Sequence, residues 1–354
     1  MSNAHWSTQA PVAHPLGIEV SGVTAWLIRA IPDAKAPFSF RLIAGGRSNL
    51  TYLVQDAADQ RYVLRRPPLG SVLATAHDMG REYRIIDALA DTDVPVAPAV
   101  AMCDDATVND APFYIMKYVE GPVLATRTDA LAYPEADRRT ASSTLMDVLG
   151  RIHAVQIDEV GLGTLGRREN YLLRQLARWQ QQYEKSKSVD IPVLDEVFRR
   201  LAASVPEQTH TGLVHGDFRL GNMILGPGGT INAVLDWELS TLGDVLADVG
   251  WLMSSWIETG EESRSPLTAA STAPGFASRR EMAEAYAGAT GRDLTLLPYY
   301  LAFSYWRSAC IGTGVVARYR AAAMAADDFD VDQHARTIVE TAQRALTALE
   351  GGLL

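Results

Sequence analysis

The chain has 354 residues, of which 47% are hydrophobic and 21% are charged, a composition typical of a folded globular protein. This length exceeds what one hydrophobic core usually serves, so we expect two lobes. The formal net charge of −10 and the isoelectric point near 5.2 argue against nucleic-acid binding, which needs a basic patch to neutralise phosphates.

Neither the cysteines nor the N-terminus indicates export or membrane insertion. The two cysteines, Cys103 and Cys310, lie far apart and form no CxxC motif, so we expect a cytoplasmic location. Residues 1–17, MSNAHWSTQAPVAHPLG, lack the basic and apolar segments of a signal peptide, and we expect a loosely held arm there. No apolar run approaches the roughly 20 residues of a membrane span, so we expect no membrane partner.

The next part of the chain has the pattern of a small antiparallel sheet with one main helix. Runs of β-branched and aromatic residues alternate with glycine-rich or polar turns, which is typical of strands. Apolar residues at helical spacing predict a helix from Thr75 to Ala90. Strands are predicted at 38–43, 50–55, 61–66, 94–100 and 111–119. Glu120-Gly121-Pro122 then breaks the pattern and predicts a hinge between two lobes.

Beyond this hinge the pattern is mainly helical. Leu145, Val148, Leu149 and Ile152 follow the i, i+3, i+4, i+7 spacing of a core-facing helix. Further helices are predicted at 169–185, 192–204, 245–258, 278–289, 297–320 and 332–349, and short strands at 223–225 and 231–235. Residues 259–278 are small, polar and interrupted by proline, which predicts a mobile loop.

These patterns predict an α+β fold with a small antiparallel-sheet lobe and a larger, mainly helical lobe. We place an arm and a first helix at 1–35, the N-terminal lobe at 36–118 and the C-terminal lobe at 119–354.

The stretch LVHGDFRLGNM at 213–223 places His215, Asp217 and Asn222 close together. His-x-Asp followed five residues later by Asn is a catalytic-loop spacing of kinases, in which the Asp faces the acceptor hydroxyl and the Asn faces a metal. Asp236, in LDWE, follows a predicted strand 19 residues after Asp217 and can bind the same metal. Magnesium favours such sparse oxygen ligation, so the sequence predicts Asn222 and Asp236 as ligands of Mg²⁺.

HGDFRLGN together with LDWE resembles the aminoglycoside phosphotransferase-like family, which includes choline and aminoglycoside kinases and has a protein-kinase-like fold. The resemblance runs over about residues 35–330. The segments GGRSNLTYLV, YVLRRPPLG, TAHDMGREYRIIDAL and GLGTLGRRENYLLRQLARW resemble more closely the kinase domain found fused to acyl-CoA dehydrogenases.

This resemblance implies a set of nucleotide-binding residues and a catalytic base. Asp217 would be the base and His215 would brace its loop, while a glycine turn would cover the phosphates of ATP. A strand arginine would contact these phosphates and pair with a helix glutamate, and a segment between the lobes would bind the adenine. The residues implied for the nucleotide are Gly46, Ser48, Asn49, Arg65, Glu82, Met116 and Tyr118.

The chain also departs from the protein-kinase pattern. The phosphate loop lacks a full GxGxxG, and the strand carries Arg65 followed by Arg66 in place of a single lysine, which leaves the register open by one residue. Trp237-Glu238 stands where protein kinases have Phe-Gly. Only about a dozen residues separate Asp236 from Asp248, too few for a long activation segment, so a protein substrate is not expected.

Two further groups of residues concern the acceptor and the support of the site. Segment 167–187 is rich in arginine, lysine and aromatic residues, which could bind an acyl-CoA, although a solvated amphipathic helix remains the alternative. The candidate substrate residues are Arg174, Arg178, Trp179 and Glu238. Asp248 is expected to support the catalytic loop or cap a turn, and Trp251 to form core or pocket wall.

The sequence therefore predicts an ATP- and Mg²⁺-dependent phosphotransferase that acts on a hydroxyl of a small molecule, and the resemblance suggests a hydroxyacyl-CoA. An aminoglycoside-type antibiotic kinase stays open because Glu258, Glu261 and Glu262 could attract a cationic substrate. A non-catalytic ATP-binding pseudokinase is the other alternative. The acceptor, the preference for ATP over GTP and a homodimeric state are left open by the sequence.

Overall fold

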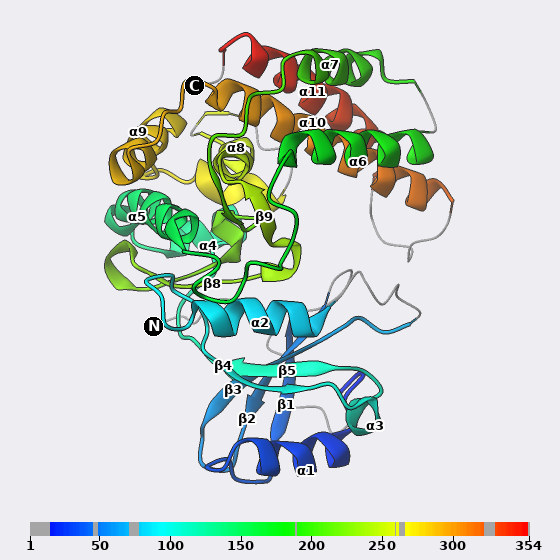
Figure 1. Cartoon of the computed structure of the whole chain (residues 1–354). Helices are drawn as coiled ribbons and strands as arrows, with labels where there is room; N and C mark the ends of the chain where they lie inside the picture. Colours follow the sequence, from blue (N-terminus) through cyan, green and yellow to red (C-terminus); the bar gives the residue numbers. More distant parts are fainter. Residues whose placement is uncertain are drawn as a thin grey trace.

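The computed structural model describes residues 15–44, 49–70, 78–187, 190–258, 260–261, 266–321 and 330–352. Within these ranges the chain forms one small lobe around a sheet and a larger, mainly helical lobe (Figure 1), so the predicted α+β fold is confirmed. None of the helices in the described part is long and apolar enough to cross a membrane.

The N-terminal lobe is built around an antiparallel sheet with the strand order β1-β2-β3-β5-β4. Its strands are β1 (Ser39–Ala44), β2 (Leu50–Gln55), β3 (Arg61–Arg66), β4 (Ala99–Cys103) and β5 (Phe113–Lys117). Three helices accompany them, α1 (Val20–Ala30), α2 (Met79–Leu89) and the short α3 (Ala106–Asn109). Helix α1 covers the outer face of the sheet, and α2 lies between the sheet and the other lobe (Figure 1).

The alternation of side chains along each strand explains why both faces of this sheet are covered. On β3, Tyr62 and Leu64 belong to the apolar cluster beneath α1. Val63, between them, belongs to the other core, and Arg65 follows it on the same face, toward the C-terminal lobe. Register on β3 therefore decides which arginine reaches the space between the lobes.

Some predicted boundaries in this lobe are wrong, for identifiable reasons. Helix α2 begins at Met79, because the side chain of Asp78 caps it by accepting from the backbone N–H of Arg81 at 2.9 Å. Residues 75–77 of the predicted helix lie outside the described residues. Strand β4 begins at Ala99, later than predicted, because Pro95 and Pro98 cannot donate hydrogen bonds to a neighbouring strand.

The end of the predicted N-terminal arm is held against the sheet. The hydroxyl of Tyr52 donates to the carbonyl of Leu16, and the guanidinium of Arg66 donates to the carbonyl of Gly17. The expectation of a loosely held arm is therefore wrong for residues 15–17, while residues 1–14 lie outside the described part.

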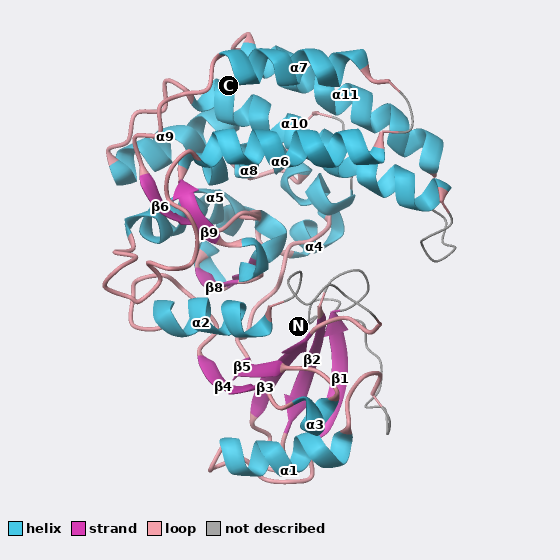
Figure 2. Ribbon diagram, turned by 45° about the vertical axis from the view of Figure 1, so that its right-hand side comes forward, coloured by secondary structure: helices cyan, strands magenta, loops and turns pink. Residues whose placement is uncertain are grey.

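The C-terminal lobe is organised around a central helix, α10, of 24 residues. Helix α10 carries buried residues on all sides and packs against α6, α7, α8 and α11 (Figure 2), as expected for a helix that is apolar around its circumference. The helices of this lobe are α4 (Arg127–Ala132), α5 (Glu135–Ala154), α6 (Tyr171–Ser186), α7 (Pro192–Ala203), α8 (Leu246–Ser255), α9 (Arg279–Thr290), α10 (Leu297–Arg320) and α11 (Val331–Leu349).

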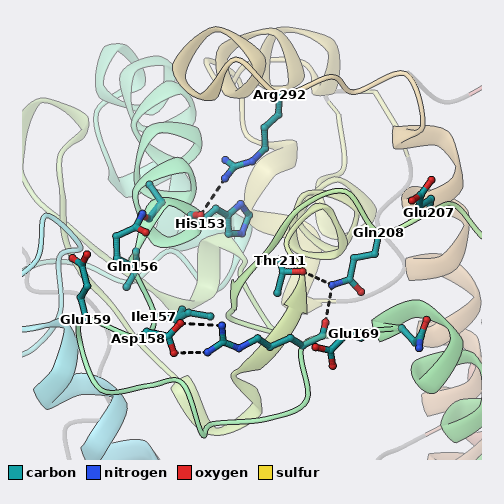
Figure 3. A pocket seen from close by; sticks show the side chains of 14 residues that line it. His153, Gln156, Ile157, Asp158, Glu159, Glu169, Glu207, Gln208, Thr211 and Arg292 are labelled. Atoms are coloured by element: carbon teal, nitrogen blue, oxygen red, sulfur yellow. Dashed lines mark hydrogen bonds and ion pairs between the residues drawn. The ribbon is translucent and has the colours of Figure 1, made fainter.

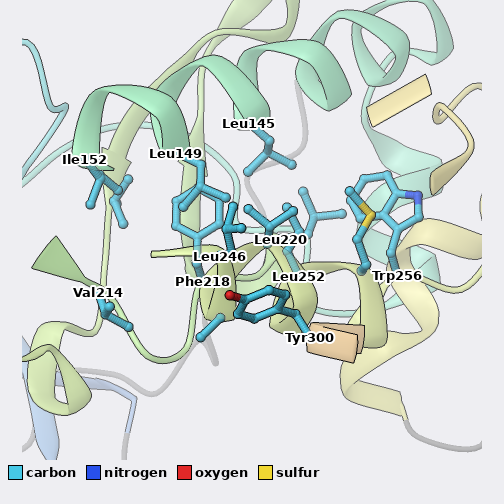
Figure 4. Close-up of a cluster of buried hydrophobic side chains, with 14 of the residues drawn as sticks. Leu145, Leu149, Ile152, Val214, Phe218, Leu220, Leu246, Leu252, Trp256 and Tyr300 are labelled. Atoms are coloured by element: carbon cyan, nitrogen blue, oxygen red, sulfur yellow. The ribbon is translucent and has the colours of Figure 1, made fainter. Parts of the chain in front are cut away.

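The predicted apolar stripe on α5 forms part of the lobe's core. Leu145, Leu149 and Ile152 are fully buried and lie over Phe218 and Leu252 (Figure 4). Phe218 directly follows Asp217 in the chain, so the core holds the backbone on which the candidate catalytic residue sits.

Two pairs of short strands surround that residue. β6 (Thr211–Val214) pairs with β9 (Thr241–Asp244), and β7 (Met223–Leu225) pairs with β8 (Ile231–Val234). The sequence predicted β7 and β8 but missed β6 and β9, which are only four residues long and each contain a glycine. The segment 259–278, predicted as a mobile loop, includes a 3-10 helix, η4 (Pro266–Thr272), which the sequence did not predict.

The connection between the lobes passes very close to β7, which gives a stability prediction. Gly121 has φ +145°, and a Cβ there would overlap the carbonyl of Leu225 and the side chain of Ile224. We expect Gly121→Ala to lower the free energy of unfolding by about 2–4 kcal/mol, through backbone strain and overpacking. Gly161→Ala is the matched control, because Gly161 also has positive φ (+75°) but a Cβ at this position would meet no atom within 4 Å. Urea denaturation that gives equal losses for both variants would contradict this account.

Candidate active site

The carboxylate of Asp217 is held at both oxygens. The indole N–H of Trp251 on α8 donates to Oδ1 at 2.8 Å, and Nδ2 of Asn222 donates to Oδ2 at 2.8 Å. Nε of Arg219 donates to Oδ2 at 3.2 Å. Because each oxygen has its own donor, the side chain is fixed in one orientation while it remains partly exposed, with 17% of its surface accessible.

The backbone of the catalytic loop is bound by a buried carboxylate. Asp248 accepts from the backbone N–H of His215 at 2.6 Å and from that of Gly216 at 2.8 Å. Burial alone would raise the pKa of Asp248, but these donors and the hydrogen bond from His153 outweigh it and leave the pKa below its usual value. The expected support of the loop by Asp248 is what the structure shows.

The two histidines near Asp248 have structural contacts that occupy their rings. Burial lowers the pKa of His153, so its ring is neutral at pH 7 and lies between the hydroxyl of Tyr286 at 2.7 Å and Asp248 at 3.4 Å. The Nε2 of His215 bonds to the carbonyl of Leu235 at 3.1 Å, and its Nδ1 accepts from the backbone N–H of Asp217 at 3.2 Å. His215 therefore connects the catalytic loop to the LDWE segment.

Arg65 is the arginine of the β3 pair that faces the space between the lobes. Its Nε lies 3.1 Å from Glu82, and its Nη2 lies 2.5 Å from Asp236 and 3.5 Å from Glu238. Burial raises the pKa of Glu82 to about 7, against the opposing charge of Arg65. Arg66 points to the opposite face and bonds to the carbonyl of Gly17, so Arg65 is the arginine of this pair that lines the cleft between the lobes.

Asn222 and Asp236, the predicted metal ligands, lie on adjoining segments. The backbone N–H of Leu235 donates to the carbonyl of Asn222 at 2.8 Å, which brings Asp236 beside the catalytic loop. Asp236 adopts a left-handed backbone conformation with φ 70°, which turns its side chain away from the strand direction. The described residues contain no group of three or more His, Cys, Asp or Glu that could hold a metal by themselves. Asn222 and Asp236 each offer a side-chain oxygen, which fits a magnesium ion that would take its other ligands from water and phosphate.

A cleft between the lobes joins these charged residues to an apolar slot. Val63, Ile86 and Met116 line it from the N-terminal lobe, and Ile224 and Val234 line it from the C-terminal lobe. Arg65, Glu82 and Asp236 line the same cleft, as does Tyr118 of the predicted hinge. The cleft thus combines apolar walls that suit a nucleobase with a cation, Arg65, that suits phosphate groups.

Of the remaining residues predicted to bind the nucleotide, the structure describes only some. Gly46 and Ser48 lie outside the described residues. Asn49 is buried, and its Nδ2 donates to Glu238 at 3.0 Å. Glu238, predicted as a substrate residue, therefore lies on the nucleotide side of the site, next to Arg65 and Asn49.

Two cations of the basic segment at 167–187 are neutralised by nearby aspartates. Arg168 pairs with Asp158, and Lys187 pairs with Asp190 and Asp195. Of the remaining predicted substrate residues, Arg174 donates to the carbonyl of Arg167 at 2.7 Å, and the guanidinium of Arg178 lies 5.3 Å from the ring of Trp179. Trp179 itself is buried, and its indole N–H donates to Gln175 at 3.2 Å.

Two further residues near the site, Arg307 and Trp251, have contacts that the sequence did not reveal. The guanidinium of Arg307 on α10 lies 5.5 Å from the ring of Trp179 and 4.2 Å from that of Trp251. Trp251 in turn donates to Asp217. The signal that could have revealed Arg307 is a single charge inside the apolar run YLAFSYWRSAC.

A model of the APH phosphotransferase enzyme family matches residues 39–285, which contain the cleft, the catalytic loop and LDWE. The chain belongs to this phosphotransferase family. The resemblance carried by HGDFRLGN and LDWE is thereby confirmed.

Curated relatives carry this phosphotransferase-like part within longer proteins. Acyl-CoA dehydrogenase family member 11 of Gallus gallus is 32% identical over 308 residues, which are 83% of this chain and 39% of that protein. Acyl-CoA dehydrogenase family member 10 of Mus musculus is 41% identical over 208 residues, which are 58% of this chain and 19% of that protein. The chain thus spans less than half the length of these relatives.

Solved structures share the fold over nearly the whole chain. A protein provisionally described as an aminoglycoside phosphotransferase from Ralstonia eutropha JMP134 is 32% identical, with a TM-score of 0.80 over 94% of this chain and 98% of that one. A choline kinase from Cryptosporidium parvum is 12% identical, with a TM-score of 0.63 over 95% and 98%. An aminoglycoside phosphotransferase in complex with AMP-PNP and hygromycin B is 16% identical, with a TM-score of 0.61 over 93% and 98%. The last two support the phosphotransferase fold alone.

A large polar pocket of this phosphotransferase lies apart from the cleft. It has a volume of about 890 Å³, and its lining includes His153, Asp158, Arg168, Gln208 and Arg292 (Figure 3). It shares no lining residue with the cleft between the lobes. Several of its polar groups already bond to one another, such as Arg168 to Asp158 and Arg292 to the carbonyl of His153.

The role of Asp248 gives a second prediction. In Asp248→Asn the amide NH₂ must face one of two N–H donors, so we expect a loss of about 2–4 kcal/mol in the free energy of unfolding at pH 7. The lowered pKa means that the carboxylate stabilises the fold above the ordinary Asp pKa, near 3.9, and that this stability is lost as the pH falls through the lowered value.

Chemical denaturation of wild type and Asp248→Asn from pH 7 to pH 3 measures this difference. We expect it to stay constant down to about pH 5 and to shrink below about pH 4. Asp147→Asn, which changes an exposed carboxylate on α5 paired with Arg151, is the control. A difference that does not change with pH would show that the charge of Asp248 is unimportant.

Proposed function

We propose that this protein transfers the γ-phosphoryl group of ATP to a hydroxyl of a small molecule, with Mg²⁺ as the metal. The observation that carries the proposal is the fixed carboxylate of Asp217 beside Asn222 and Asp236, where the apolar cleft meets the C-terminal lobe. Phosphoryl transfer depends mainly on positioning and charge stabilisation, and this arrangement supplies both.

Each residue has a distinct part in the proposed reaction. Asp217 aligns the acceptor hydroxyl and accepts its proton as the phosphoryl group is transferred. Arg65 neutralises charge on the phosphates, and Glu82 holds the guanidinium in place from the buried side. Asn222 and Asp236 would hold Mg²⁺, and the ion would supply positive charge that offsets the charge of the phosphates.

The site favours an enzyme over a pseudokinase. A protein that only binds ATP has no use for a carboxylate fixed by three donors outside the nucleotide cleft, because such a group repels the phosphates. Asp217 is held by Trp251, Asn222 and Arg219 and is not among the cleft-lining residues.

The structure gives little support to a cationic antibiotic as the acceptor. Glu261 lies 2.5 Å from Arg279 and 3.0 Å from Arg344, and Glu258 accepts from the backbone N–H of Arg279 at 2.7 Å. These two carboxylates are therefore already paired, and Glu262 lies outside the described residues. As the finer proposal we take a hydroxyacyl-CoA, supported by relatives named as acyl-CoA dehydrogenase family members.

The test of the base combines an acceptor screen with one mutation. ATP consumption is measured in parallel with hydroxylated acyl-CoAs, aminoglycosides and sugar alcohols, and we expect phosphorylation of an acyl-CoA. Asp217→Asn should lower this rate by roughly 10²–10⁴-fold with little change in ATP affinity, because Asp217 faces the acceptor and not the nucleotide. Near-normal turnover in Asp217→Asn would remove Asp217 from the mechanism, and turnover of aminoglycosides alone would replace the acyl-CoA proposal.

The metal ligand Asp236 gives a prediction that depends on magnesium. With Mg²⁺ present, we expect Asp236→Ala to weaken ATP binding by roughly 10-fold or more and to lower activity with it. Without Mg²⁺ the same variant should bind ATP no more weakly than wild type, because Arg65 is released from its ion pair with Asp236. Isothermal titration with and without Mg²⁺ separates the two effects. Equal weakening under both conditions would point to a general structural defect.

A further inference from the structure

Arg307 is a buried cation without a carboxylate partner among the described residues. Only 8% of its surface is accessible, and Nη2 donates to the carbonyl of Gly216 at 3.0 Å. Nε is buried and has no hydrogen-bond partner within the part of the chain that the structure describes. Buried guanidinium groups are normally paired with anions, because an unpaired buried charge is costly. The charges of Asp217 and Asp248 act on this guanidinium, but neither carboxylate forms an ion pair with it, so an oxygen in direct contact with Nε is the group that this environment lacks.

The position of Arg307 connects this charge to the reacting group. Its guanidinium lies 4.2 Å from the ring centroid of Trp251, whose indole N–H donates to Asp217. Gly216, which accepts from Arg307, directly precedes Asp217 in the catalytic loop. A group bound at Arg307 therefore lies one indole ring away from the base. Trp251 is partly exposed, so solvent reaches its side chain beside Asp217.

A second cation, Arg178, lies near the same group of side chains. The guanidinium of Arg178 is 5.3 Å from the ring of Trp179, and that of Arg307 is 5.5 Å from the same ring. Arg178 is exposed and forms no ion pair with a described carboxylate, unlike Arg168 and Lys187 of the same segment. Two such cations at one tryptophan attract anionic oxygens and repel the ammonium groups of aminoglycosides.

We propose that Arg307 binds an acyl oxygen of the acceptor and thereby selects which hydroxyl compounds reach Asp217. The oxygen belongs either to the carboxylate of a free hydroxy acid or to the carbonyl of its thioester. A guanidinium makes strong, oriented hydrogen bonds to such oxygens, and the partly exposed Trp251 offers apolar surface for the carbon chain. This inference rests on the proposed phosphotransferase function.

The experiment compares three acceptors of equal chain length. They are a 4-hydroxy acid, its CoA thioester, and the diol in which the carboxyl group is reduced to an alcohol. Wild type should prefer one of the acyl compounds over the diol in kcat/KM. Arg307→Gln should lower kcat/KM for that compound by roughly 10–100-fold, mainly through its KM, and should remove the preference over the diol. The KM for ATP should change by less than about twofold, since Arg307 is not part of the nucleotide cleft.

Two other variants separate binding from structure. Arg307→Lys keeps the charge and should recover part of the preference, whereas loss of packing alone would not be corrected by lysine. Arg318→Gln, which changes an exposed arginine on the same helix, should behave as wild type. Arg178→Gln should raise the KM for the thioester more than the KM for the free acid if the phosphates of CoA bind at Arg178.

The outcomes distinguish failure of this inference from failure of the proposed function. Equal losses for acyl compounds and diol in Arg307→Gln, or no preference in wild type, would show that Arg307 only braces the loop. Acceptor binding is also measured by titration of the inactive Asp217→Asn protein loaded with Mg²⁺ and AMP-PNP, with and without Arg307→Gln. Phosphorylation of other alcohols with no binding of either acyl compound would overturn the inference and leave the phosphotransferase function intact. Absence of Mg²⁺-dependent nucleotide binding would overturn both.

Discussion

Two backbone N–H groups, those of His215 and Gly216, donate to the one buried carboxylate of Asp248, and the geometry of the active site follows from this contact. Asp248 lies on α8, and Trp251, three residues further along, lies on the same face of that helix. The helix therefore fixes the catalytic loop twice, through its backbone at Asp248 and through the side chain of Asp217 at Trp251. Because α8 is itself packed against α10, the position of Asp217, the candidate base, is set by the core of the lobe and not by the loop's own sequence.

The nucleotide side depends on a different constraint, the alternation of side chains along β3. That alternation sends Arg65 toward Glu82 and Asp236, while its neighbours Leu64 and Arg66 face the outer core and the N-terminal segment. The ion pair between Arg65 and Asp236 joins the two lobes, and so does the hydrogen bond from Arg81 to the carbonyl of Ser240 at 2.7 Å. The same few polar contacts thus position the lobes and assemble the charges that phosphoryl transfer requires.

Much of the fold was predictable because its signals are local. The apolar stripe on α5, the strands of the small lobe and the spacing of Asp217, Asn222 and Asp236 can each be read within short windows of sequence. The arrangement of charge was not predictable in this way. Arg168 and Arg178 look alike in the sequence, yet only Arg168 forms an ion pair with an aspartate among the described residues. Glu261 forms a hydrogen bond with Arg344, which lies 83 residues away in the chain. Arg307 contacts Gly216 across 91 residues, a relation that no local pattern could indicate.

The family model ends at residue 285, whereas α10 and α11 follow that point. The matched segment therefore contains the candidate base, both candidate metal ligands and the cleft between the lobes, and the helix that carries Arg307 lies beyond it. If Arg307 contacts the acceptor as proposed, substitutions on the inner face of α10 would change the choice of acceptor without altering the side chains proposed to handle ATP, because those side chains belong to other elements.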